Sequence, residues 1–167
     1  ENTIFNVTVK THPAGPSQNC VVSTGTGIVP VYNTPFDPSS GLAGGTGDAT
    51  GVAVSCVTNS YAVAYNVTGL AGSGLQVSLQ SPPGTTVETQ SVDANGSLVF
   101  DTLLPDLSSY QLVVAANPTA LSQGCTFAVS TGTLGGADVS PFAHGLTCVT
   151  NSYSISANIT GVNASNT

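Results

Sequence analysis

Three features of this sequence predict an all-β fold made of repeated units. Apolar and polar residues alternate along short runs, the four cysteines form an even set, and one six-residue segment recurs 92 positions further along the chain. Alternation with a period of two indicates strands with one buried face, because successive side chains of a strand point to opposite sides. No segment shows sustained helical spacing.

The alternating runs are short and are separated by turn residues such as Asn95-Gly96, a typical hairpin pair. The apolar faces of the runs are, in chain order, Phe5, Val7 and Val9; Tyr61, Val63, Tyr65 and Val67; Leu75, Val77 and Leu79; Leu98 and Phe100; Tyr110, Leu112 and Val114; residues 126–129; and residues 146–149. Short strands at this spacing favour a two-layer β architecture.

Self-similarity divides the chain into units. The segment Cys-Val-Thr-Asn-Ser-Tyr occupies residues 56–61 and 148–153, and residues 66–69 match residues 158–161 at the same offset of 92. Cys20 matches Cys125, and Pro13 matches Pro118, at an offset of 105. The offsets differ because the first copy carries a longer loop at residues 30–48, rich in Pro, Gly, Ser and Asp, which do not continue a central strand.

The chain therefore divides into three parts. Residues 1–56 are predicted to be the last three strands of one repeat plus the loop 30–48, residues 57–148 a complete seven-stranded repeat, and residues 149–167 the first strand of a following repeat. The expected fold is an immunoglobulin-like β-sandwich repeat with incomplete repeats at both ends. The chain lacks the Trp of antibody domains, so this likeness concerns architecture only.

The repeat also selects one pairing of the cysteines. We expect disulfides Cys20–Cys56 and Cys125–Cys148, one within each copy; four free core thiols are the alternative. Each bridge closes a loop of a few tens of residues, worth about 3 kcal/mol in the chain-entropy model. An even cysteine set without a C-x-x-C pair argues against zinc and redox motifs and favours an oxidising, extracellular setting.

Charge excludes several classes of partner. The formal charge is −7, and Lys10 is the one basic residue. A nucleic-acid binder needs clustered Lys or Arg to replace condensed counterions, and an anionic membrane surface needs the same groups. No apolar run approaches the roughly 20 residues that span a bilayer. We therefore expect a secreted, extracellular or cell-surface protein without nucleic acid and without membrane insertion.

Residues 57–148 resemble a known repeat type. The likeness lies in residues 66–70 and 72–80, in residues 92–100, and in residues 109–114 followed by Asn117-Pro118 and residues 123–126. Together these resemble the tandem immunoglobulin-like β-sandwich repeats of large bacterial secreted or cell-surface proteins. The resemblance implies an adhesin, stalk or fibre module without catalytic residues. The loop 30–48 and the glycosylation sequons depart from that pattern.

Five Asn-x-Ser/Thr sequons are candidate glycosylation sites. They are Asn6, Asn66, Asn95, Asn158 and Asn163. The strand pattern points the first, second and fourth outward and places Asn95 in a turn, so a glycan has room at these positions. The alternative is chance occurrence in a chain rich in Asn and Thr.

No catalytic or metal site is predicted, and no cofactor. His12 and His144 are expected to be ordinary surface histidines, because zinc needs three or four converging ligands. The carboxylates that could serve glycoside chemistry are expected to be solvated at strand ends and turns: Glu88, Asp93, Asp101 and Asp106. Calcium ligation by Asp37, Asp48 and Asp138 lacks the spacing of a known loop motif.

The incomplete ends predict the function. Three strands cannot close a two-layer core, and the tail carries an apolar face, Tyr153, Ile155 and Ile159, with nothing to cover. We expect the tail to be a donor strand that joins copies head to tail into a homopolymer, a filament or fibre; a slice of a longer repeat protein is the other explanation. The alternative function is an adhesin or carbohydrate-binding module using Tyr32 and Phe36.

Overall fold

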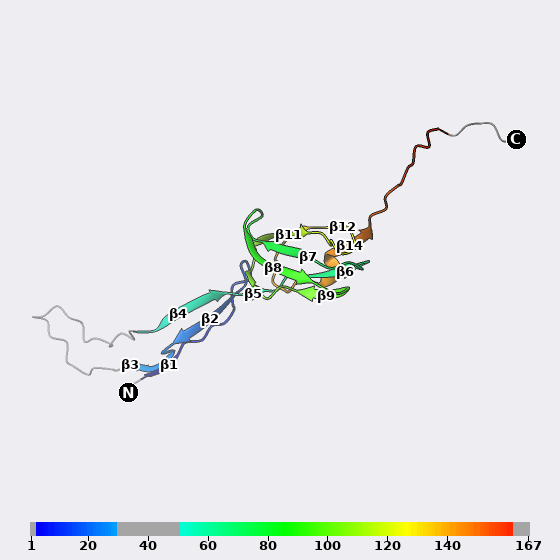
Figure 1. Cartoon of the computed structure of the whole chain (residues 1–167). Helices are drawn as coiled ribbons and strands as arrows, with labels where there is room; N and C mark the ends of the chain where they lie inside the picture. The colour runs from blue at the N-terminus through cyan, green and yellow to red at the C-terminus, as the bar shows by residue number, and fades with distance from the viewer. Residues whose placement is uncertain (1–2, 30–50, 162–167) are drawn as a thin grey trace, which may run out of the picture.

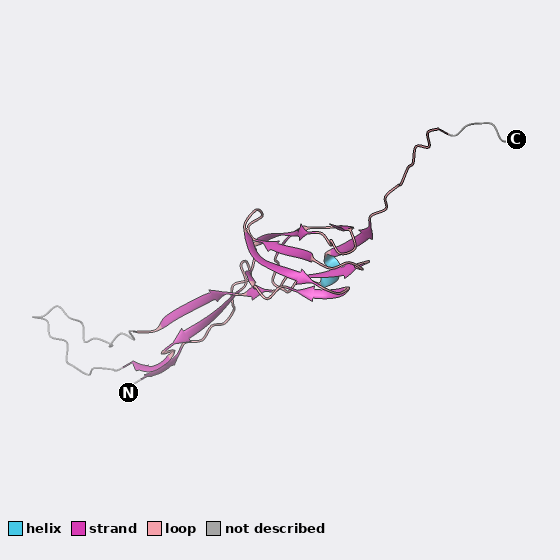
Figure 2. Cartoon of the chain, in the orientation of Figure 1, coloured by secondary structure: helices cyan, strands magenta, loops and turns pink. Residues whose placement is uncertain are grey.

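The computed structural model describes residues 3–29 and 51–161, and this part of the chain confirms the all-β prediction (Figures 1 and 2). Apart from its strands, it contains one 3₁₀ turn at Pro141–Ala143. The N-terminal strands are β1 (Thr3–Asn6), β2 (Gln18–Ser23), β3 (Thr26–Val29) and β4 (Ala53–Thr58). The strands that follow are β5 (Ser60–Tyr61), β6 (Ala64–Thr68), β7 (Leu75–Gln80), β8 (Thr86–Val92), β9 (Gly96–Val99), β10 (Leu104–Pro105), β11 (Ser109–Ala116), β12 (Gln123–Phe127), β13 (Thr131–Thr133) and β14 (Gly145–Thr150).

Strands β5 to β14 form the central unit. One four-stranded sheet has the order β13-β11-β7-β8, and the other has the order β12-β14-β6-β9. Neighbouring strands in both sheets are antiparallel except β14 and β6, which run parallel. The short strands β5 and β10 form a two-stranded pair at one end.

The two sheets share one apolar core, which follows directly from the alternation in the sequence. In β7, Leu75, Val77 and Leu79 are fully buried. The ring of Tyr65 in β6 packs against Phe100, with 5.2 Å between ring centroids. The buried core residues are Val63, Tyr65, Val67, Leu70, Leu75, Val77, Leu79, Val92, Phe100, Leu104, Tyr110, Leu112, Cys125, Leu134, Leu146 and Cys148.

The N-terminal strands lie outside this core. Strand β1 pairs with β3, and β2 pairs with β4, each as a two-stranded antiparallel sheet. These strands and the C-terminal tail, residues 151–161, extend from opposite sides of the central unit (Figure 1). The tail has no strand pairing within the described residues.

The strand bounds differ from the predictions in three ways. The N-terminal part has four strands where we expected three, because Thr26–Val29 pairs with β1. Strands β4 and β14 end at Thr58 and Thr150, so the boundaries expected after residues 56 and 148 fall inside strands. Strand β8 was not predicted, because its sequence TVETQSV lacks regular apolar alternation. The central unit has seven strands of four residues or more, and three shorter ones.

Candidate functional site

The pairing contacts of the N-terminal strands correspond to those of strands β11 to β14 in the central unit. Cys20 faces Cys56 across β2 and β4, and Cys125 faces Cys148 across β12 and β14. Both pairs form disulfides, as the sequence predicts. The correspondence thus extends from the sequence offsets to the strand register.

The other N-terminal strand pair shows the same correspondence. Phe5 of β1 faces Gly27 of β3, and Tyr110 of β11 faces Gly132 of β13. In both pairs the aromatic ring lies over the glycine so closely that a Cβ atom there would collide with the ring. A glycine is therefore required opposite the aromatic residue in each of these strand pairs.

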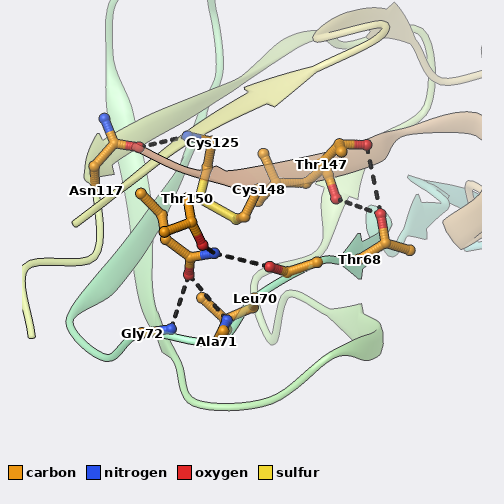
Figure 3. The surroundings of a disulfide bond; sticks show 12 residues. Thr68, Leu70, Ala71, Gly72, Asn117, Cys125, Thr147, Cys148 and Thr150 are labelled. Atoms are coloured by element: carbon orange, nitrogen blue, oxygen red, sulfur yellow. Dashed lines mark hydrogen bonds between the residues drawn. A yellow bond between two sulfur atoms is a disulfide. The ribbon is translucent and has the colours of Figure 1, made fainter. Parts of the chain in front are cut away.

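A hydrogen bond from a side chain to the backbone N–H of one cysteine recurs at both disulfides. The Cys20 N–H donates to His12 Nδ1 at 3.0 Å, and the Cys125 N–H donates to Asn117 Oδ1 at 2.8 Å (Figure 3). His12 and Asn117 are 105 positions apart. The imidazole of His12 therefore replaces an amide as a backbone acceptor, a role that sequence reasoning missed.

Side chains that are buried in the central unit are exposed at the equivalent N-terminal positions. Leu146 is fully buried, whereas Val54, its equivalent in β4, is 58% exposed. Leu112 is 1% exposed and Val7 is 41% exposed. The difference arises because β6 lies beside β14 and β7 beside β11, whereas no described strand covers β4 and β1 in that way. We call the exposed side chains of Val7, Val54 and Cys56 the open face.

The C-terminal tail carries the complementary feature. Tyr153, Ile155 and Ile159, the predicted assembly strand, are 77%, 99% and 77% exposed. The residues 92 positions earlier, in and before β6, are half-buried at Tyr61 and almost fully buried at Val63 and Val67. The tail therefore has the sequence of a core strand without the neighbours of one.

A buried amide fixes the loop after β6 beside the second disulfide. The Gln123 side chain accepts the N–H groups of Ala71 and Gly72 at 2.9 and 2.8 Å, and donates to the Gly69 carbonyl at 2.9 Å and to the Thr150 hydroxyl at 3.3 Å. Figure 3 shows Ala71, Gly72 and Thr150 around it. This network ties the loop after β6 to β12 and β14.

An acidic side chain joins the N-terminal strands to the central unit. Asp106 accepts the N–H of Ser17 at 2.7 Å and the N–H of Gly136 at 2.8 Å. Its own N–H donates to the Asn59 carbonyl at 2.8 Å. The Tyr61 hydroxyl lies 3.0 Å from Ser17 Oγ. We call Asp106, Ser17, Asn59 and Tyr61 the junction cluster.

These contacts lower the pKa of the Asp106 carboxyl group. The Ser17 N–H is the main cause, supported by the N–H groups of Gly136 and Leu107, while burial acts in the opposite direction. The prediction that this carboxylate is simply solvated is wrong, because Asp106 is buried and bound by backbone donors.

Glu88 also differs from the expectation. Burial raises its pKa, but the N–H groups of Thr102 and Asp101 and the Gln90 amide outweigh burial, so the pKa of Glu88 is lowered. Its carboxylate accepts the Thr102 N–H at 2.7 Å and the Asp101 N–H at 3.2 Å. Glu88 therefore caps the turn after β9, a structural role. Asp93 and Asp101 lie exposed in turns.

His144 is buried, which corrects the prediction of a surface histidine. Its Nε2 lies 2.8 Å from the Tyr110 hydroxyl, and its Nδ1 lies 2.7 Å from the Val129 carbonyl. Nδ1 must donate to that carbonyl, so Nε2 accepts from the hydroxyl in the neutral ring. Among the described residues, no group of three potential metal ligands surrounds it. The imidazole thus links sheet and loop inside the core.

The sequons differ in accessibility. Asn6 and Asn158 are exposed, and Asn66 is half-buried, with its Oδ1 accepting from Ser97. The exposed Asn95 uses its amide to accept the Leu70 N–H and to donate to the Leu70 carbonyl, both at 2.8 Å. Asn163 lies outside the described residues.

The other predicted binding residues are less informative. Asp138 accepts the Ala62 N–H at 2.8 Å, so its carboxylate has a structural partner. Asp37 and Asp48, Tyr32 and Phe36, and the whole loop 30–48 lie outside the described residues.

Comparison with known proteins gives no assignment. No family model matches the chain, and no curated protein and no solved structure matches it. In residues 3–29 and 51–161, no helix has the length and apolar character needed to cross a membrane. The two disulfides indicate a compartment outside the reducing cytoplasm.

Proposed function

We propose that this protein is a structural subunit of an extracellular filament or cell-surface fibre, built from immunoglobulin-like sandwich repeats. Copies join head to tail, and the tail of one copy adds a strand to the open face of the next. The observation that carries the proposal is the complementarity of the two ends: β4 lacks the neighbour that β14 has, and the tail has the sequence of that neighbour.

The central unit supplies the register of this joint. In its second sheet, β14 and β6 run parallel, with Leu146 opposite Val67. The equivalent positions are Val54 in β4 and Ile159 in the tail. A donated tail therefore places Ile159 beside Val54 and runs parallel to β4, which removes two exposed apolar side chains from water.

One donated strand does not complete a unit. The tail replaces β6, whereas the central unit also uses β7, β8 and β9 to cover the same core. Covering the rest of the open face therefore requires further strands from other copies. A contact between unlike ends is heterologous, and it propagates into a filament when the rotation between copies does not close a ring.

A pair of tail variants tests the proposal. Ile159→Asp places a charge at the core-facing position, and Thr160→Asp places the same charge at the position equivalent to the exposed Thr68. All proteins are produced in a host that adds no N-linked glycans, because Thr160 completes the Asn158 sequon. We expect size-exclusion chromatography and negative-stain imaging to show filaments for the wild type and Thr160→Asp, and monomers for Ile159→Asp. A compact monomeric wild type at high concentration contradicts the proposal.

The proposed setting is secreted or on the cell surface, with N-linked glycans at the exposed sequons Asn6 and Asn158. This role uses no catalytic group or cofactor. A chain with one basic residue also presents very few trypsin sites, which suits a durable external material.

A further inference from the structure

We propose that the turn at Ser122, at the C-terminal end of the central unit, is a binding site for a carboxylate of the next copy, and that Glu1 supplies that carboxylate. The inference rests on the proposed head-to-tail assembly and names a polar contact that the assembly strand alone does not provide.

The junction cluster inside the chain is the template. Around Ser17, the Asn59 N–H donates to the Ser17 carbonyl at 2.9 Å, the Asn59 side-chain amide donates to Ser17 Oγ at 2.5 Å, and the Tyr61 hydroxyl lies 3.0 Å from the same oxygen. The Asp106 carboxylate then accepts the Ser17 N–H. Three contacts come from the connecting segment, and the fourth comes from the following unit.

The Ser122 turn has the first three contacts. The Asn151 N–H donates to the Ser122 carbonyl at 2.9 Å, the Asn151 side-chain amide donates to Ser122 Oγ at 2.8 Å, and the Tyr153 hydroxyl lies 3.1 Å from that oxygen. The Ser122 N–H, which is the counterpart of the donor to Asp106, has no acceptor among the described residues. The turn is built like the first junction and lacks only its acid.

Exposure supports the same conclusion. Tyr61 and Asn59 are half-buried at the formed junction, whereas Tyr153 and Asn151 are exposed. The Ser122 turn is hydrogen-bonded to Asn151, the first residue of the tail. The occupant must therefore come from beyond this unit.

Glu1 occupies the matching place in the sequence. It precedes Asp106 by 105 positions, the offset that aligns Phe5 with Tyr110 and Cys20 with Cys125. Glu1 itself lies outside the described residues.

The charge of the chain explains why a backbone donor is used. With a formal charge of −7 and one lysine, two copies repel each other, and ion pairs between them are scarce. A backbone N–H binds a carboxylate without any cation, and such charge-assisted hydrogen bonds are stronger than neutral ones. Assembly should therefore tighten with added salt, which screens the repulsion but acts weakly on a partly buried hydrogen bond.

Sedimentation velocity of three full-length proteins tests the proposal. Glu1→Gln removes the acceptor charge, and Asp93→Asn removes one charge at an exposed turn as the matched control. Both substitutions remove one negative charge and so reduce the repulsion between copies. If charge alone mattered, both variants would associate as tightly as the wild type or more tightly. We expect Glu1→Gln to weaken association roughly tenfold, as removal of one charged hydrogen bond does, and Asp93→Asn to leave it unchanged or strengthen it.

The outcomes separate the two proposals. If Ile159→Asp abolishes association and Glu1→Gln equals the wild type, the carboxylate site is wrong and strand donation stands. If Glu1→Gln weakens association and Ile159→Asp does not, the carboxylate site stands without strand donation. A wild type that stays monomeric at all concentrations overturns both.

Discussion

Two equivalent core positions give the sharpest test of the open face. Leu146 and Val54 are 92 positions apart and occupy the same place in β14 and β4, but a neighbouring strand covers only Leu146. Truncation to Ala at each position measures how much that neighbour contributes. The two positions have the same setting otherwise: each lies two residues before a disulfide cysteine, in a strand that pairs antiparallel with the strand of the other cysteine.

The expected magnitudes follow from burial. Leu146→Ala removes three carbon groups from a fully buried site, about 2.4 kcal/mol at ~0.8 kcal/mol each, and the cavity brings the cost to about 3–5 kcal/mol. Val54→Ala removes two carbon groups from a side chain that is 58% exposed, so only about 0.7 kcal/mol is lost in the isolated chain. When a donated strand covers Val54, the loss should rise to about 2 kcal/mol.

Urea unfolding followed by circular dichroism measures both values, because the chain has no Trp to report by fluorescence. Measured at a concentration where the chain is monomeric, the free energy of unfolding should fall much more for Leu146→Ala than for Val54→Ala. In assembled material, Val54→Ala should also weaken association. Equal effects in the monomer would refute the claim that β4 lacks its neighbour.

Gln123→Ala should cost about 2 kcal/mol in urea unfolding, because it removes the buried amide that binds the Ala71 and Gly72 N–H groups and the Gly69 carbonyl. Gln18→Ala, which loses a single side-chain contact to Thr58, should cost under about 1 kcal/mol. Under mild reduction followed by alkylation and mass spectrometry, Cys20–Cys56 should open before Cys125–Cys148, since Cys56 is exposed and Cys148 is buried; simultaneous opening would contradict this. Because the pKa of Asp106 is lowered in the fold, its contacts stabilise the junction at pH values above its ordinary pKa of 3.8, and this stabilisation is lost as the pH falls through the lowered pKa. The NMR amide resonances of Ser17 and Gly136 should therefore shift below about pH 4 in the wild type and not in Asp106→Asn. In a host that adds N-linked glycans, glycopeptide analysis should show higher occupancy at Asn6 and Asn158 than at the half-buried Asn66.

The strand architecture could be predicted because it is a local pattern. Alternation identified the core-facing residues of β6, β7 and β11, and the two sequence offsets gave both disulfides. Strand β8 could not be predicted from alternation. It is an edge strand of its sheet and most of its side chains are not buried, so its sequence TVETQSV needs no alternation of apolar and polar residues.

The polar contacts of the junction could not be predicted in this way. Asp106 reads as an ordinary turn acid, because nothing in the local sequence shows that Ser17, 89 residues away, would donate to it. His144 likewise reads as a surface residue until the fold brings Tyr110 and Val129 to its two nitrogens. One signal was available: Ser17, Asn59 and Tyr61 recur as Ser122, Asn151 and Tyr153, and recurrence of polar residues at a junction indicates shared contacts.

The open face makes the isolated chain prone to association with other chains. Val54 in β4 and Val7, just after β1, are exposed, and an uncovered apolar surface of this kind invites association with other chains. Proteins commonly protect such strands with lysine, and the one lysine here, Lys10, follows β1 rather than lying in β2 or β4. Negative charge slows unspecific contact between copies but gives no specificity. In the proposed assembly, a matching strand at the other end of the chain and an acid-binding turn beside it supply that specificity, so the surface that would otherwise cause aggregation becomes the ordered contact.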